Sequence, residues 1–137
     1  MATFASDYAR GTASQVANRT VIEGLVGSSL VEDQNPYATF DFHNEGKTIY
    51  VELKTRFIAH DTYPTALIGA NKVRFCSDPN KTYYFVWAYT DGLYYIKYDP
   101  TVFEHLECRP FVRHARADYN DVETDHYFIP HTLLTKV

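Results

Sequence analysis

Residues 37–57 read YATFDFHNEGKTIYVELKTRF, and this stretch decides the fold. On either side of the Asn44-Glu45-Gly46 segment, aromatic and β-branched residues alternate with polar ones, which is typical of two strands joined by a tight turn. We therefore predict a hairpin with one strand over residues 37–43 and the next over residues 47–57. The apolar face of the second strand is expected to build the core, and its polar face to point the other way.

The predicted hairpin brings two carboxylates together. Asp41 lies on the first strand and Glu52 on the second, so both can reach one point. Glu52 and Lys54 are two residues apart on a strand and therefore share a face. Two adjacent acids repel each other unless a cation lies between them, and Mg²⁺ and Mn²⁺ prefer oxygen ligands. The pattern predicts a site for Mg²⁺ or Mn²⁺ whose ligands are Asp41, Glu52 and the backbone carbonyl of Leu53.

These groups are suited to the hydrolysis of a phosphodiester. A divalent cation neutralises the phosphate and acidifies a bound water molecule. A lysine at the edge of the site, here Lys54, can orient that water and offset the charge of the transition state. A second interpretation stays open, in which Glu52, Lys54 and Arg56 form a solvated strand face with cross-strand ion pairs.

The rest of the sequence indicates alternating helices and strands. The predicted order is α-β-β-α-β-β-(α)-β, which favours an α/β three-layer sandwich with a central mixed β-sheet flanked by helices, in a single domain over residues 1–137. The turn between the third and fourth strands is predicted at Asp91-Gly92. Besides the first hairpin, helices are expected over residues 12–30, 62–75 and 101–106, and strands over residues 81–90, 93–98 and 126–130.

Asp41 followed by Glu52-Leu53-Lys54 resembles the motif of the PD-(D/E)xK nuclease superfamily, although Phe40 stands where that motif has a proline. The resemblance covers most of the chain and is greatest to the small stand-alone modules of viruses and mobile elements. It implies a restriction-endonuclease-like fold and a metal-dependent endonuclease. In that enzyme Asp41 and Glu52 would bind the metal and Lys54 would be catalytic, with DNA as the substrate in preference to RNA.

The same resemblance gives roles to residues outside the hairpin. Glu23 on the first predicted helix would be an accessory acid that orients metal or water, and an ion pair with Arg19 is the alternative. Lys72 matches a place where the superfamily often has a basic residue near the scissile phosphate. Arg56 and Lys72 are therefore expected to contact the substrate.

Composition limits the classes to which the protein can belong. Of its 137 residues 45% are hydrophobic and 22% are charged, which excludes long disorder and low-complexity repeats. No apolar run reaches about 18 residues, and the N-terminal sequence lacks an apolar signal core, so we expect no membrane span and no secretion. We expect an intracellular protein, in the cytoplasm or, if viral, the host nucleus. Cys76 and Cys108 are too few for a disulfide framework and are expected to be free.

The charge balance bears on the kind of partner. A net charge of -4 disfavours a cationic DNA-coating protein, but it is compatible with an enzyme that holds divalent cations between carboxylates. A module this small has little surface for both recognition and catalysis, so we expect a homodimer with two active sites. The rival hypothesis is a non-catalytic nucleic-acid-binding or protein-binding module on the same fold. Its 12 tyrosines would serve an interface and its carboxylates would form salt bridges.

Residues 107–125 are basic in the first half and acidic in the second, so we expect a solvated loop in preference to a DNA-binding surface. Near its start, His105 and Cys108 together with His114 have the loose spacing of zinc ligands, but no second cysteine pair lies nearby. The basic cluster of this segment consists of Arg109, Arg113, His114 and Arg116.

Overall fold

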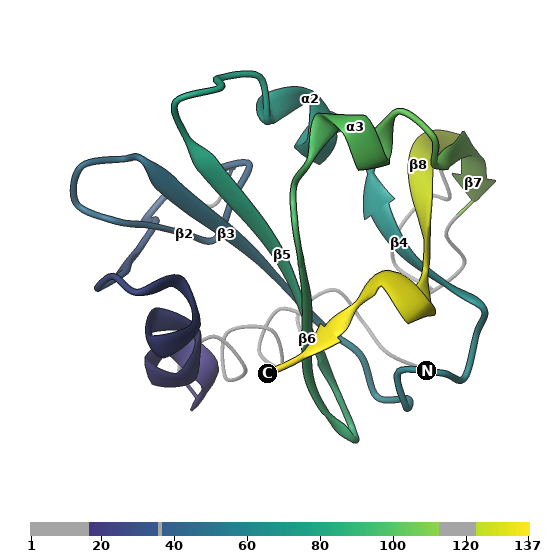
Figure 1. Ribbon diagram of the computed structural model, residues 1–137, viewed down its shortest axis with the longest axis horizontal. Coiled ribbons are helices and arrows are strands. Elements are labelled where there is room, and N and C mark those ends of the chain that lie inside the picture. The colour runs from purple at the N-terminus through teal and green to yellow at the C-terminus, as the bar shows by residue number, and fades with distance from the viewer. Residues whose placement is uncertain (1–16, 36, 113–122) are drawn as a thin grey trace.

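The computed structural model describes residues 17–35, 37–112 and 123–137, and Figure 1 shows how its elements are arranged. Two β-sheets pack against each other, and a helix covers the far face of the larger sheet. The larger sheet has the order β1 (Val31–Glu32), β2 (Phe42–His43), β3 (Ile49–Thr55), β5 (Thr82–Tyr89), β6 (Gly92–Lys97) and β9 (Thr135–Lys136). The smaller sheet has the order β4 (Thr65–Gly69), β8 (Glu123–Pro130) and β7 (Glu107–Val112).

The helices are short. The described part of the first one covers residues 17–26, so it ends before the predicted residue 30, at Gly27, whose φ of 73° suits a glycine after the last helical turn. The backbone N–H of Gly27 donates to the carbonyl of Glu23 at 2.9 Å, which satisfies one of the free carbonyls of the helix end. None of the described helices is long and apolar enough to cross a membrane. The others are α2 (Ala70–Phe75), α3 (Pro100–Phe103) and the 3₁₀ turn η1 (His131–Leu133).

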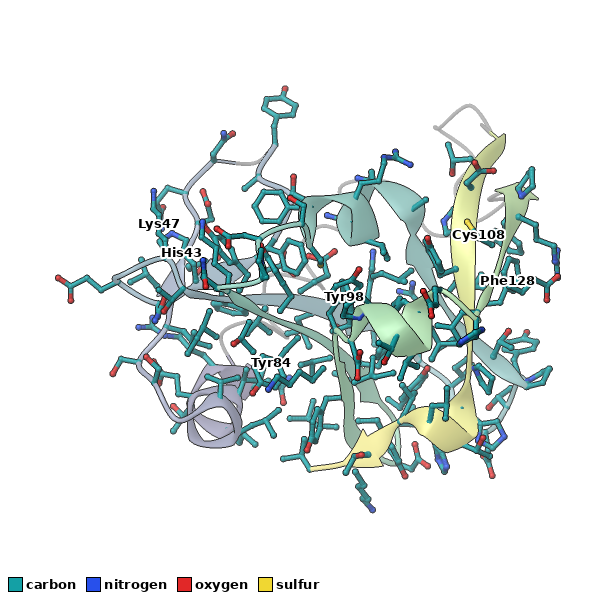
Figure 2. All side chains as sticks on the ribbon, turned by 45° about the horizontal axis from the view of Figure 1, so that its top comes forward. His43, Lys47, Tyr84, Tyr98, Cys108 and Phe128 are labelled. Atoms are coloured by element: carbon teal, nitrogen blue, oxygen red, sulfur yellow. The ribbon has the colours of Figure 1, made fainter. Side chains whose placement is uncertain are left out.

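Two hydrophobic clusters lie on opposite faces of the larger sheet. β3 and β5 are its central strands and run parallel, with Glu52 beside Phe85 in the register. Both strands are covered on both faces, which explains their long apolar runs. Tyr84 packs against the cluster on the helix side, whereas Tyr98 packs against the cluster between the sheets (Figure 2). The helix-side cluster contains Ile22, Leu30, Phe42, Val51, Leu53 and Val86, and the cluster between the sheets includes Phe40, Ile68, Val73, Phe85, Trp87 and Ile129.

The predicted first hairpin is present, but its first strand is shorter than predicted. The turn begins at Asn44, whose side-chain oxygen accepts hydrogen bonds from the N–H groups of Thr48 and Ile49 at 2.8 and 3.1 Å. β2 covers only Phe42–His43, because residues 39–41 form a bend in which the Asp41 carbonyl accepts from the N–H of Asp33 at 2.9 Å. Asp41 therefore precedes the strand on which it was predicted to lie.

The helix predicted over residues 62–75 is wrong in its first half. Residues of β4 alternate between partly buried and buried side chains, with Ala66 and Ile68 buried, and the strand pairs with β8. Alternation of this kind suits a strand that packs one face on the core. A helix begins only at Ala70, so the predicted helix of fourteen residues is a strand followed by α2, which has six.

The loop predicted over residues 107–125 is also wrong in part. Residues 107–112 form β7, which pairs with β8 from Glu107 opposite Phe128 to Val112 opposite Glu123. The guanidinium of Arg109 lies over the ring of Phe128, 3.9 Å from its centroid, so this basic residue is held on a strand. Arg113, His114 and Arg116 lie outside the described residues, and so does the predicted zinc ligand set that includes His114.

Other sequence predictions are confirmed. The predicted hairpin of β5 and β6 is present, but its two turn residues are Thr90 and Asp91, and Gly92, with a φ of 136°, begins β6. α3 begins after Asp99, whose carboxylate accepts from the N–H of Thr101. Cys76 and Cys108 are free thiols. The class is α/β with a mixed sheet, but a second sheet and α2 occupy the side where a layer of helices was predicted.

Candidate metal centre

A pair of carboxyl groups lies where the first hairpin enters the core. Asp41 occupies the bend before β2, and Glu52 occupies the middle of β3. The two carboxyl groups lie within hydrogen-bonding reach of each other, and this contact is one of the causes that raise the pKa of Asp41. Glu52 is only 4% exposed and is the buried charged residue of the described chain. The prediction that the hairpin brings Asp41 and Glu52 together is confirmed.

The backbone of β3 holds Asp41 in place. β2 pairs with β3 only as far as Phe42 opposite Val51, so the next edge groups of β3 have no strand partner there. The Asp41 carboxylate fills this position and accepts a hydrogen bond of 2.8 Å from the N–H of Leu53. The short first strand thus has a consequence for the site, because a side chain takes the place of the backbone at the sheet edge.

The environment of Asp41 favours its neutral form. Burial, followed by the negative charge of Glu52 and the hydrogen bond to it, raises the pKa of Asp41 to about 8. The hydrogen bond from Leu53 and the charge of Lys72 act in the opposite direction and are weaker. With a pKa of about 8, Asp41 keeps its proton at neutral pH.

Two lysines neutralise Glu52. The ammonium nitrogen of Lys72 lies 3.1 Å from Glu52 Oε2, and that of Lys54 lies 3.5 Å from the same oxygen. Lys72 reaches the site from α2 and also donates a hydrogen bond to the carbonyl of Thr39. Both lysine side chains are mostly buried. The site therefore holds two acids and two lysines, and Glu52 is the residue that the other three approach.

Most residues that the sequence singled out are gathered here. Asp41, Glu52, Leu53, Lys54 and Lys72 all take part in the contacts of the site. The alternative interpretation of a solvated strand face is wrong for Glu52, whose side chain is buried. Its expectation of ion pairs is met by Lys54 and Lys72, and Arg56 is exposed. The sequence did not indicate that Lys72 would approach Glu52 more closely than Lys54 does.

Glu23 and Arg56 have partners of their own. The Glu23 carboxylate accepts a hydrogen bond of 2.7 Å from the N–H of Leu30 and lies 3.6 Å from Arg19, so the predicted alternative of an ion pair with Arg19 is confirmed. These contacts give Glu23 a structural role at the end of its helix, and its role as an accessory acid stays a prediction. Arg56 follows β3 and is exposed, with its guanidinium donating to the carbonyl of Thr55.

The donor set of the site fits a hard divalent cation. Asp41 and Glu52 offer carboxylate oxygens, and such oxygens are the ligands that Mg²⁺ and Mn²⁺ prefer. In an extended strand the N–H and C=O of one residue point toward the same neighbouring strand. The carbonyl of Leu53 is therefore directed to the same edge as its N–H, which faces Asp41.

Comparison of the chain with protein-family models and with curated proteins finds no match. What the site can do is therefore inferred from its own geometry and chemistry.

Proposed function

We propose that the protein is a divalent-metal-dependent nuclease whose metal centre consists of Asp41 and Glu52. The observation that carries this proposal is the close pair of carboxyl groups, held in the core next to two lysines. Such a pair is costly for stability, because each acid disfavours the ionisation of the other. A divalent cation removes this cost, and the oxygen-only donor set suits Mg²⁺ or Mn²⁺.

With a pKa of about 8, Asp41 holds a proton at neutral pH, which it would have to lose before it could bind a cation. Glu52, Asp41 and the Leu53 carbonyl are the groups that would hold the ion. When bound, the cation supplies charge neutralisation for a phosphate and a water of lowered pKa.

Lys54 and Lys72 both neutralise Glu52 Oε2. If Glu52 held a cation, these two ammonium groups would be close enough to the site to interact with phosphate oxygens and with the attacking water. Lys54 and Lys72 are therefore the groups that we assign to orient the water and offset the charge of the transition state.

The core fold, the substrate and the oligomeric state are proposed from the sequence motif of Asp41 and Glu52-Leu53-Lys54. Its resemblance to the PD-(D/E)xK nucleases supports a restriction-endonuclease-like core, DNA as the substrate in preference to RNA, and a homodimer. A central strand that carries Glu52 and Lys54, beside a parallel strand and a bend that carries Asp41, supports the same grouping. Arg56, exposed beyond the end of β3, is assigned to the phosphate backbone of the substrate.

The test is a cleavage assay on supercoiled plasmid, single-stranded DNA, a four-way junction and RNA, with Mg²⁺ and with Mn²⁺. We expect the wild type to cleave at least one DNA substrate, and we expect EDTA, Asp41→Asn and Lys54→Ala each to abolish cleavage. Arg74→Ala is the matched control, because Arg74 is an exposed base on the same helix as Lys72. Absence of cleavage by folded wild type, or equal cleavage by Asp41→Asn, would contradict the proposal.

One observation favours a second candidate, a non-catalytic binding module. Glu52 is already neutralised by two lysines, and a buried ion cluster of this kind can persist for structural reasons alone. A structural cluster has no need of a cation. If the folded protein neither binds Mn²⁺ at millimolar concentration nor cleaves any substrate, this candidate replaces the nuclease.

A further inference from the structure

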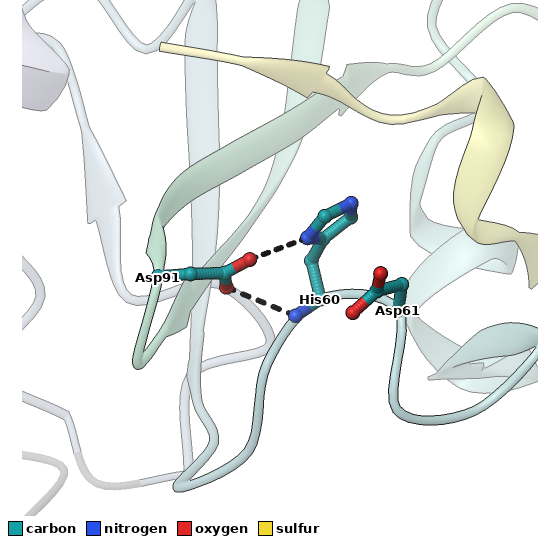
Figure 3. Close-up of side chains that lie close together, drawn as sticks. All are labelled: His60, Asp61 and Asp91. Atoms are coloured by element: carbon teal, nitrogen blue, oxygen red, sulfur yellow. Dashed lines mark hydrogen bonds and ion pairs between the residues drawn. The ribbon is translucent and has the colours of Figure 1, made fainter.

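We propose that His60, Asp61 and Asp91 form a second divalent-cation site, which takes a transition-metal ion of the Zn²⁺ type. Within the described residues these three are the group whose ligand atoms, one from each residue, all lie within 4.8 Å of one another. In Figure 3 the Asp91 side chain points toward the His60 ring, and Asp61 is the next residue in the chain after His60. One imidazole nitrogen with two carboxylates suits Zn²⁺ better than Mg²⁺, which prefers oxygen ligands alone.

The polypeptide holds the donors together without an ion. Asp91 lies in the turn between β5 and β6, and its carboxylate accepts from the backbone N–H of His60 at 2.9 Å. Its other oxygen lies 2.5 Å from Nδ1 of the His60 ring. The N–H of Thr90 also donates to the carbonyl of Ile58 at 3.0 Å. Two segments far apart in sequence are thereby fixed side by side, so a ligand set is prepared in advance.

The orientation of the His60 ring is fixed by its neighbours. It stacks on Tyr94 with centroids 4.2 Å apart and an angle of 13° between the planes. The ring of His131 lies edge-on to it at 5.7 Å, so a further imidazole belongs to the same neighbourhood. A ring that cannot rotate loses little freedom when a metal binds.

This site is separate from the Asp41–Glu52 centre. Glu52 lies beside Phe85, and β5 continues for four residues to Tyr89 before the turn that holds Asp91. At about 3.3 Å per residue, the second site is more than about 13 Å from the first. The proposal does not rest on the nuclease activity, and its failure would leave the first centre untouched.

The consequence of binding is a cross-link between the loop after β3 and the hairpin of β5 and β6. A ligand that binds only the folded chain stabilises it, so the melting temperature should rise with Zn²⁺ concentration.

The experiment is a calorimetric titration of the full chain with Zn²⁺ alone, in an Asp41→Asn background that removes the first centre. We expect one ion to bind per chain, with at least about tenfold weaker affinity in His60→Ala and in Asp61→Asn. If His60→Ala folds poorly, Asp61→Asn is the decisive variant, because Asp61 is exposed and asparagine has nearly the same shape as aspartate. Circular dichroism checks the fold of each variant.

Two controls exclude other ligands. His105→Ala removes an exposed histidine that pairs with Glu104 and should bind Zn²⁺ like the parent. Cys108→Ser removes the exposed thiol, which is a natural ligand of Zn²⁺, and should also leave binding unchanged. Unchanged affinity in folded Asp61→Asn, or loss of binding in Cys108→Ser alone, would overturn the proposal.

Discussion

The ammonium nitrogen of Lys72 lies 3.1 Å from Glu52 Oε2, so a base from a short helix neutralises a buried acid on the central strand. Lys54, the lysine of the sequence motif, lies 3.5 Å from the same oxygen. Lys72 also donates to the carbonyl of Thr39, which ties α2 to the bend that carries Asp41. Lys72 therefore connects three segments of the site, whereas Lys54 approaches Glu52 from the same strand.

This relationship predicts that Lys72 matters more for stability than Lys54. Lys72→Met leaves the Thr39 carbonyl without its donor and Glu52 with one base, and should lower the free energy of unfolding by about 2 kcal/mol in EDTA. Lys54→Met should cost about half as much. The measurement is urea denaturation at pH 7, with Arg74→Met as the control on the exposed side of α2. An equal loss in all three variants would contradict this account.

The raised pKa of Asp41 predicts that metal binding depends on pH. Below a pKa of about 8 each bound cation displaces one proton, so Mn²⁺ affinity should rise about tenfold per pH unit from pH 6 to pH 8 and level off above it. Titration calorimetry in two buffers of different ionisation enthalpy would count the released proton. An affinity that is the same at pH 6 and pH 8 would show that Asp41 is not a ligand.

Removal of the Asp41 charge should stabilise the protein without metal. The pKa of Asp41 is raised from 3.8 to about 8, so between these pH values the folded state keeps a proton that the unfolded chain has lost. The stability of the wild type in EDTA therefore falls as pH rises from 4 to 8. The amide introduced by Asp41→Asn does not titrate, so this variant should exceed the wild type in stability by at least about 1 kcal/mol at pH 8.

Asp41→Asn should also lose Mn²⁺ binding and cleavage. Its gain in stability and its loss of function together distinguish a metal ligand from a structural residue. A residue that is purely structural would lose stability on substitution, whereas a metal ligand gains stability and loses the metal. Chemical denaturation at pH 5 and pH 8 measures the first effect. A lower stability of Asp41→Asn at pH 8 would contradict the assignment.

Glu23 allows a test of the role that the motif gave it. Its carboxylate accepts from the N–H of Leu30, so Glu23→Ala should destabilise the protein by about 1 kcal/mol. If its role is only structural, Mn²⁺ affinity and cleavage should stay unchanged in Glu23→Ala at temperatures where it is folded. A loss of Mn²⁺ affinity of about tenfold or more would restore Glu23 as an accessory acid.

The sequence predicted what depends on neighbours along the chain. The turns at Asn44 and around Asp91, a helix end near Gly27 and the approach of Asp41 to Glu52 all follow from local patterns. Each involves a turn or cap whose chemistry is confined to a few residues. For the same reason the alternation of apolar and polar residues along β3 can be recognised from the sequence alone.

What could not be predicted depends on contacts between distant segments. The sequence of β4 predicts the start of a helix. The segment is a strand because it pairs with β8, some sixty residues later in the chain. Glu52, which one interpretation of the strand pattern placed on a solvated face, is buried and paired with Lys72 of α2. His60 and Asp91 are 31 residues apart, and only the fold brings their side chains together. Pairing of this kind has no local signal.

Whether Asp41 and Glu52 bind a metal is decided by Mn²⁺ binding at pH 8, measured by titration calorimetry. It should use a His60→Ala background, so that the second group of ligands does not contribute. The account predicts one Mn²⁺ per chain with Asp41 present and no measurable binding after Asp41→Asn. Equal binding by both proteins, or no binding to folded protein at millimolar Mn²⁺, would contradict the assignment of Asp41 and Glu52 as a metal centre.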